Sequence, residues 1–278
     1  MDDCTANDCL VQCRGRVFER VTVDHAVEGG TKVYWDLNPE FVVRSPLEFT
    51  LFTGRVDNPE ADDWQQVGLP AEDAPFLVDD EKRLYGTQAW THYRIRLLDR
   101  DGVEYWSEPT SILQSLPWRD WVKIENLVRK ERLRLRMGAG TEGFLLKRRV
   151  YGDPCPLCLD FQTGESTNSA CSRCYGTKLD GGYFPAIPCV YAEISVGEVR
   201  YHVEAERGSV GNPPAVAIML ADPILFEEDV WVEADTDQRW YVHSIKPRME
   251  VRGRAVIQEV TMTLAEFNDR IYQFPVPH

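Results

Sequence analysis

The sequence lacks the features that mark membrane proteins and many enzyme families. No run approaches the roughly 18 consecutive apolar residues that a transmembrane helix needs. The first residues, MDDCTANDC, are acidic where a secretory signal is basic and then apolar, so we expect no signal peptide and synthesis in a cytosol. The 5 histidines are scattered, and no G-x-S-x-G, H-E-x-x-H or P-loop motif occurs. We therefore expect neither membrane contact nor enzyme activity.

What the sequence does contain is enough apolar material for one large domain or two ordinary ones. Its 278 residues are 43% hydrophobic and 11% aromatic, which excludes a disordered chain. The net charge of −14 opposes nonspecific binding to nucleic acid. Residues 118 to 149 differ, because they hold 10 Lys and Arg against 4 Asp and Glu, a balance of +6. This basic stretch is either a solvated helix face or a surface that contacts phosphate or an acidic protein.

Four of the 8 cysteines form two C-x-x-C pairs, Cys155 with Cys158 and Cys171 with Cys174. Two such turns supply four soft thiolate ligands, the set that tetrahedral Zn²⁺ takes in a closed structural site. Two local disulfides and a redox-active pair are the alternatives. A redox pair normally follows a strand and opens a helix, whereas CPLC follows the turn residues YGDP. We therefore expect a structural zinc, which leaves no coordination position open for catalysis.

The remaining cysteines fit no standard zinc frame. Three of them lie in an N-terminal arm formed by residues 1 to 15, and they are Cys4, Cys9 and Cys13. We favour free thiols or bonds between subunits for these three, and a second metal shared with His25 is the other alternative. We expect Cys189 to be a small, buried apolar residue.

Residues 16 to 114 show short runs of period-2 alternation between turn residues, which predicts a β-sandwich. In HYRIRLLD, for example, Tyr93, Ile95 and Leu97 fall on one face. The last hairpin, Tyr93 to Pro109, resembles the closing strands of a fibronectin type III domain. It has the tyrosine, the alternating apolar positions, the D/G turn and the Ser-x-Pro exit that this family often shows. The resemblance implies a domain for presentation or contact rather than for catalysis.

Residues 115 to 140 are expected to link the sandwich to a second domain as a helix and a turn. The apolar residues of the helix recur at helical spacing, and they are Trp121, Ile124, Leu127 and Val128. Residues 138 to 143, GAGTEG, then form a formal G-x-G-x-x-G. A dinucleotide site needs a strand before this motif and a helix after it, whereas here a charged helix precedes it and the strand-like FLLKRRV follows. We therefore expect GAGTEG to be a flexible turn.

Residues 141 to 278 return to a β pattern that the cysteine pairs interrupt. Four segments, AEISVGEVRYHVEA, AVAIMLADP, VWVEADTDQRWYVHSIKP and RAVIQEVTMTLAEF, hold about five or six strands, and DTDQ marks a hairpin turn. These strands predict a small barrel or sandwich, with residues 150 to 185 inserted as a zinc lobe. The whole chain is therefore expected to be mainly β.

Residues 118 to 275 resemble neck proteins of tailed bacteriophages, the head-completion and tail-adaptor rings of the head-to-tail connector. EDVWVEADTDQRWYVHSIKPRMEVRGRAVIQEVTMTLAEF is similar to their β-barrels, and LLKRRVYGDPCPLC with CSRCYGTKLDGGYFP is similar to zinc-bearing neck or connector proteins. A fibronectin-like domain fits as well, because phage structural proteins often carry immunoglobulin-like modules. The resemblance implies a structural virion protein, made in the host cytoplasm, in a ring that joins head or portal to tail.

The basic stretch is the expected contact surface of such a ring. Its five candidate residues recur too densely for one helix face, and they are Arg129, Lys130, Arg132, Arg134 and Arg136. We favour an acidic face of a neighbouring subunit over genome DNA in the channel, with other neck, portal or tail proteins as further partners. The alternative function is a cytosolic zinc-knuckle adaptor or nucleic-acid-binding module. An adaptor would be monomeric or dimeric, whereas a ring subunit assembles.

Overall fold

The structure is a computed structural model that describes residues 17–26, 30–38, 46–55, 57–60, 62–80, 91–111, 117–160, 171–195 and 214–277. The chain is mainly β, as the alternation of its residues predicts. It divides into two compact units, Met1–Trp121 with Val150–Asp153 and Val122–Arg149 with Pro154–His278. Within the ranges given above, no helix combines the length and the apolar character that a membrane span requires.

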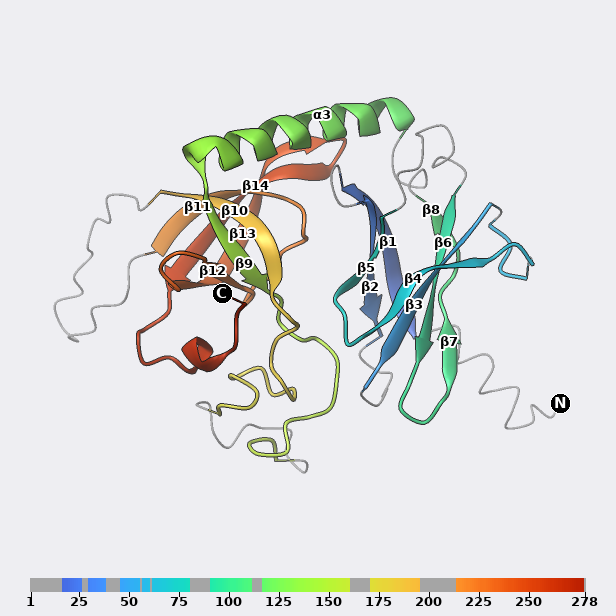
Figure 1. Cartoon of the computed structure of the whole chain (residues 1–278), viewed down its shortest axis with the longest axis horizontal. Coiled ribbons are helices and arrows are strands. Elements are labelled where there is room, and N and C mark those ends of the chain that lie inside the picture. The colour runs from blue at the N-terminus through green and yellow to red at the C-terminus, as the bar shows by residue number, and fades with distance from the viewer. Residues whose placement is uncertain are drawn as a thin grey trace, which may run out of the picture. The chain divides into compact units, whose positions relative to one another are not determined.

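The first unit is a sandwich of two antiparallel sheets (Figure 1). One sheet has the order β1-β2-β5, and the other has the order β4-β3-β6-β7 with β8 paired to β6. The strands are β1 (Phe18–Ala26), β2 (Gly30–Leu37), β3 (Glu48–Gly54), β4 (Gln65–Glu72), β5 (Phe76–Asp79), β6 (His92–Leu98), β7 (Glu104–Trp106) and β8 (Thr110–Ser111). A three-stranded sheet thus faces a five-stranded one whose fifth strand, β8, is only two residues long, an arrangement like that of a fibronectin type III sandwich.

Alternating side chains fill the space between the two sheets. Every second side chain in the centre of β6 is fully buried, as the alternation predicts, and these are Tyr93, Ile95 and Leu97. Trp35 of β2 lies against Phe49 of β3 with ring centroids 4.4 Å apart, so the two sheets share one core. The buried Tyr93 hydroxyl donates a hydrogen bond to Asp79 over 2.9 Å, so its polar end is satisfied inside the sandwich.

Helix α3 (Trp118–Arg134) begins in the first unit and continues into the second. Three of the four predicted apolar residues, Trp121, Ile124 and Val128, are less than a tenth exposed, and the fourth, Leu127, is half-buried. Asp120 lies in its first turn and Arg132 and Arg134 in its last turn, where each sign of charge favours the helix dipole.

Only the first part of the segment GAGTEG is a turn, which corrects the expectation that all of residues 138 to 143 form a flexible turn. The π-type turn η2 (Leu135–Ala139) ends the helix, and Gly138 has a φ of 124° that favours glycine. Strand β9 (Thr141–Leu146) already contains Gly143. A Cβ at Gly143 would lie 2.4 Å from the carbonyl oxygen of Val232, so this glycine permits close strand packing. Phe144, the first residue after the motif, continues this strand, whereas a dinucleotide site would need a helix there.

The second unit is built on a closed antiparallel barrel with the strand order β10-β11-β14-β13-β12-β9 (Figure 1). Besides β9, its strands are β10 (Ile187–Ser195), β11 (Pro214–Leu220), β12 (Val230–Glu233), β13 (Arg239–Val251) and β14 (Arg254–Leu264). The hairpin predicted at DTDQ joins β12 to β13, and Asp237 in this turn has a φ of 55°. Trp231, Val260 and Met262 are fully buried in the interior, which is filled by side chains.

The C-terminal segment covers the outer face of part of this barrel. Ile271, in the 3-10 helix η3 (Arg270–Gln273), is buried in one cluster with Val230 and Val232, whose side chains leave β12 on the opposite side from Trp231. Arg239, only 2% exposed, donates hydrogen bonds to the carbonyl oxygens of Ile271 and Phe274. These bonds satisfy a buried guanidinium and fix the segment to β13.

Candidate metal centre

The cysteine pairs lie in the connection between β9 and β10, in a part called the Cys lobe below (residues 154–184). Two backbone hydrogen bonds join the chain entering the lobe to the chain leaving it. Phe184 donates to the carbonyl oxygen of Lys147 over 2.9 Å, and Arg149 donates to that of Gly182 over 3.0 Å. Within the lobe, Cys155 donates to the carbonyl oxygen of Lys178 over 2.8 Å. The turn that carries Cys155 and Cys158, called the first knuckle, therefore lies beside the segment that follows Cys171 and Cys174, the cysteines of the second knuckle.

A buried ion pair secures the base of the lobe on the barrel. The ammonium of Lys147 lies 2.7 Å from the carboxylate of Asp229, and both side chains are almost fully buried. The backbone N–H of Arg148 donates to the other carboxylate oxygen over 2.8 Å. A buried pair is retained only when its remaining polar atoms are satisfied in this way. Sequence reasoning missed this pair, because its members stand 82 residues apart.

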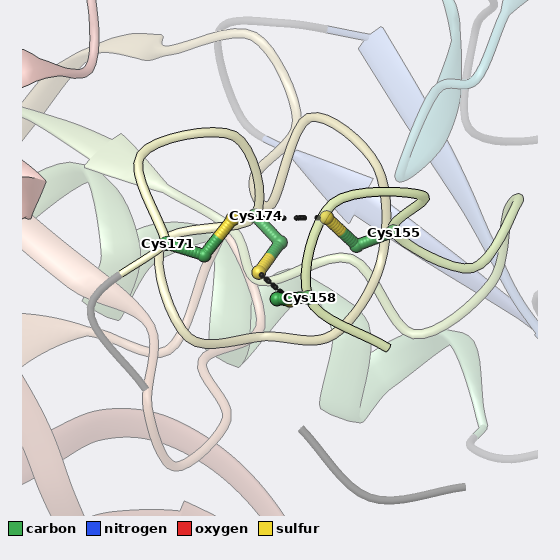
Figure 2. A group of neighbouring side chains, drawn as sticks. All are labelled: Cys155, Cys158, Cys171 and Cys174. Carbon is green, nitrogen blue, oxygen red and sulfur yellow. Dashed lines mark hydrogen bonds between the residues drawn. The ribbon is translucent and has the colours of Figure 1, made fainter. Parts of the chain in front are cut away.

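The four cysteines face one another across the centre of the lobe (Figure 2). All four are buried, and their Sγ atoms lie within 4.8 Å of one another. The Sγ atoms of Cys155 and Cys171 are 3.8 Å apart, and those of Cys158 and Cys174 are 3.3 Å apart. Both distances exceed the roughly 2.05 Å of a disulfide bond, and the cysteines are free thiols. The structure thus brings together the four residues that the sequence singled out.

The knuckle turns aim backbone donors at the sulfur atoms. The N–H of Cys174 lowers the pKa of Cys171 to about 7, whereas burial raises the pKa of Cys155 despite the N–H groups of Leu157 and Cys158. Donors of this kind stabilise a thiolate, the form in which cysteine binds metal. A tight cluster of buried thiols with such donors is compatible with a metal site, and four protein ligands around one ion leave no position for a substrate.

The second knuckle depends on backbone conformations that favour glycine. Gly176 and Gly182 have φ values of 88° and 68°. A Cβ on Gly182 would lie 2.7 Å from the carbonyl oxygen of Cys174 and 2.8 Å from the Tyr175 ring. These glycines let the chain turn closely around the second cysteine pair.

No family model, curated protein or solved structure matches this chain. The chemistry of the centre therefore has to be argued from its own residues and their surroundings.

Aromatic rings join the lobe to the C-terminal segment: Phe274 packs edge-on against Tyr175 and Tyr183, with centroid distances of 5.4 Å and 5.7 Å. The residue that follows Cys174 is thus part of the contact between the lobe and the barrel.

The five basic candidates are spread around α3 and the turn after it, and most of them contact groups of the same chain. Arg129 pairs with Glu125 at 3.3 Å, and Arg132 approaches Asp222 at 3.9 Å. Arg134 lies 2.7 Å from Glu131 and 2.6 Å from Glu193, and hydrogen bonds to these carboxylates raise its pKa. The guanidinium of Arg136 lies over the ring of Tyr191, 5.8 Å from the centroid. Lys130 is exposed. The structure thus separates arginines held against the barrel from basic residues that face outward.

Cys189 is exposed, so the expectation of a small buried residue is wrong. The register of β9 and β10 shifts between Ile187 and Val190, and Cys189 in this bulge has a φ of 59°. A bulge interrupts the regular alternation of inward and outward side chains, and here it leaves the Cys189 side chain at the surface. The predictions for Cys4, Cys9 and Cys13 lie outside the described residues, as does the side chain of His25.

Proposed function

We propose that this chain is a structural virion protein, one subunit of a ring in the neck of a tailed bacteriophage. The observation that carries the proposal is the closed barrel of β9 to β14 with the Cys lobe inserted between β9 and β10. The resemblance of residues 118 to 275 to neck proteins implies this arrangement. In the proposal, the ring joins head or portal to tail, and its subunits are made in the host cytoplasm and remain in the virion.

The filled interior of the barrel supports a structural role over a ligand-carrying one. The inward side chains form one buried apolar cluster that includes Leu145, Trp231 and Met262. A small barrel packed in this way offers partners its outer surface and its hairpins rather than its interior. In a neck, those partners are further copies of the chain and other neck, portal or tail proteins, with genome DNA passing through the channel. The fibronectin-like sandwich adds a second contact domain.

The β13–β14 hairpin supports assembly through side chains. β12 pairs with β13 only over Arg239–Tyr241, whereas β14 pairs with β13 as far as Val251. Lys246, Pro247 and Arg248 are exposed on this ribbon. Lysine and proline on a strand edge oppose the addition of a further strand, so the ribbon is suited to side-chain contact with a partner.

In this proposal, Cys155, Cys158, Cys171 and Cys174 hold one Zn²⁺ with a structural role. Zn–S bonds of about 2.3 Å in a tetrahedron place the sulfur atoms about 3.8 Å apart. The separation of Cys155 and Cys171 is 3.8 Å, and that of Cys158 and Cys174 is somewhat shorter at 3.3 Å. Bound zinc would stiffen a lobe that packs on the barrel, and thereby an interface of the ring. The donor set of four buried thiols fits a closed site rather than a catalytic one.

Mass photometry and negative-stain electron microscopy of the purified protein test the proposed function. A neck subunit is expected to form closed rings of one defined mass, and its peptides are expected in purified virions. A chain that stays monomeric or dimeric and binds nucleic acid would support the zinc-knuckle adaptor instead. A chain that neither assembles nor occurs in virions would contradict the neck assignment.

A further inference from the structure

Helix α3 and the turn after it carry two opposite stripes of side chains. The inner stripe is buried and holds Trp121, Ile124, Val128 and Leu135. The outer stripe is exposed, has the helical spacing i, i+4, i+7, i+11, and consists of Asn126, Lys130, Leu133 and Met137. The solvated face of an amphipathic helix carries mostly charged and polar residues, so two large apolar side chains one turn apart on it stand out. The two apolar members of the outer stripe therefore need an explanation.

The exposure of these two side chains is large. Leu133 is 60% exposed and Met137 is 80% exposed. They stand beside Lys130, which is also exposed, and Arg129, which pairs with Glu125 on the helix surface. Arg132 and Arg134 instead reach acidic groups of the barrel unit. The outer stripe thus has an exposed apolar end, Leu133 and Met137, with the cation of Lys130 beside it.

The complementary surface is on the first unit. Met1–Trp121 with Val150–Asp153 holds 12 Lys and Arg against 24 Asp and Glu, a net charge of −12, whereas the rest of the chain holds 19 against 21, a net charge of −2. Strand β4 is an edge of its sheet, and its Leu69 is 86% exposed. Exposed carboxylates stand on this strand and on the turn before it, and they are Asp57, Glu60, Asp62 and Glu72. The β4 edge is thus an acidic surface with an apolar centre.

We propose that the outer stripe of α3 in one copy docks on the β4 edge of a second copy. Each surface supplies exposed apolar side chains, and the charged residues beside them, Lys130 on the stripe and the carboxylates at the β4 edge, are opposite in sign, which favours this pairing over the pairing of two identical surfaces. The contact is heterologous, because the two surfaces are different parts of the chain, and heterologous contacts close into rings when the rotation permits. The inference rests on the proposed neck function and names the contact that would build the ring.

The form of the contact follows from the shape of β4. Gly68 has a φ of 69°, Pro70 removes a backbone donor, and the pairing of β4 with β3 shifts between Phe49 and Leu51. These features interrupt the regular edge that a further strand would need. The docking therefore uses side chains, with Leu133 and Met137 against Leu69 and with Lys130 near the acidic residues.

A mixing experiment with two full-length variants tests the contact. The stripe variant carries Leu133→Asp and Met137→Asp, and the edge variant carries Leu69→Asp. Phe267→Asp is the matched control, because Phe267 is 93% exposed and belongs to neither surface. Mass photometry measures self-association, and circular dichroism checks that every variant is folded.

Each surface variant is expected to weaken self-association at least about tenfold, while the control assembles like the unmodified chain. An equimolar mixture of the two variants is expected to form heterodimers and nothing larger. Each heterodimer would use the intact stripe of the edge variant and the intact edge of the stripe variant.

The other outcomes separate this inference from the proposed function. If the unmodified chain forms rings and both variants do so equally well, the contact is wrong and the neck function stands. If both variants lose assembly but their mixture yields no heterodimer, the two surfaces do not meet each other, and the inference fails. If the unmodified chain never assembles, both the inference and the proposed self-assembly fail.

Discussion

The barrel and the Cys lobe are stabilised by different interactions. In the barrel, apolar side chains from the strands form one buried cluster around Trp231, Val260 and Met262. At the centre of the lobe, the buried cluster formed by the residues that the structure describes consists of the four cysteines. Apolar burial stabilises a fold in any aqueous buffer, whereas clustered thiolates repel one another unless a cation lies between them. We therefore expect treatments that unfold one region to leave the other intact.

Loss of the metal should have the largest effect, and only on the lobe. Cys155→Ser removes one of the four proposed ligands, and structural zinc sites contribute on the order of 10 kcal/mol or more to the folding of their segments. Hydrogen exchange measured by mass spectrometry should show the lobe unprotected and the barrel strands protected. Elemental analysis should find about one zinc per unmodified chain and little in the variant.

Cys189→Ser is the matched control for this experiment, because Cys189 is exposed and lies outside the cluster. It should change neither the metal content nor the exchange pattern. Equal zinc content in Cys155→Ser and in the unmodified chain would contradict the assignment of the ligands.

The opposite perturbation is Trp231→Ala in the barrel. Trp231 is fully buried and its indole N–H donates to the carbonyl oxygen of Val190 over 3.0 Å, so the substitution leaves a cavity and removes this buried hydrogen bond. We expect a loss of about 3–5 kcal/mol in the free energy of unfolding, measured by urea denaturation. Phe267→Ala should change it by less than about 0.5 kcal/mol, because Phe267 is exposed. A small effect of Trp231→Ala would mean that the barrel does not depend on this core.

The base of the lobe offers a third, somewhat smaller perturbation. Lys147→Met would leave the carboxylate of Asp229 buried without its cation, at a cost of about 3 kcal/mol. The double variant Lys147→Met, Asp229→Asn should recover part of this loss, because it removes the uncompensated charge. Thermal denaturation of the two variants measures the difference. If the double variant were less stable than the single variant, the ion pair would not be the origin of the loss.

The smallest expected effect is that of Arg134→Ala on the surface of α3. Arg134 lies within 2.7 Å of Glu131 and 2.6 Å of Glu193, but its side chain is 40% exposed, so water and salt screen both pairs. We expect a loss of less than about 1 kcal/mol, which decreases further as salt is added. Denaturation at low and high ionic strength checks this dependence.

Local patterns in the sequence predict the strands and the metal-ligand candidates, because the causes of both are local. The alternation of Tyr93, Ile95 and Leu97 reports directly which side of β6 is buried. The spacing of each cysteine pair reports a tight turn, and the two turns meet in the structure. Cys189 was predicted wrongly, because a bulge interrupts the alternation at that residue and no local signal marks it.

Interactions between distant residues could not be predicted from one sequence. The closure of the barrel requires β9 to pair with β12, and no residue pattern in either segment indicates that the other is its partner. The same holds for Arg134, whose partner Glu193 stands 59 residues away. The density of basic residues around α3 was visible in the sequence, but their division into barrel contacts and an outer stripe depends on these distant partners.

The closed base of the Cys lobe has a consequence for the order in which the protein folds. Strands β9 and β10 are neighbours in the barrel, yet the whole lobe separates them along the chain. Bringing the ends of a long flexible loop together costs more conformational entropy than closing a short one. A lobe that has bound its metal joins its own ends at Lys147 and Phe184, so it acts as a short turn between the two strands. Binding of the proposed metal would then speed the pairing of β9 with β10 without deciding whether the barrel forms. Without metal the same seam is expected to close more slowly, and the finished barrel is expected to stay folded.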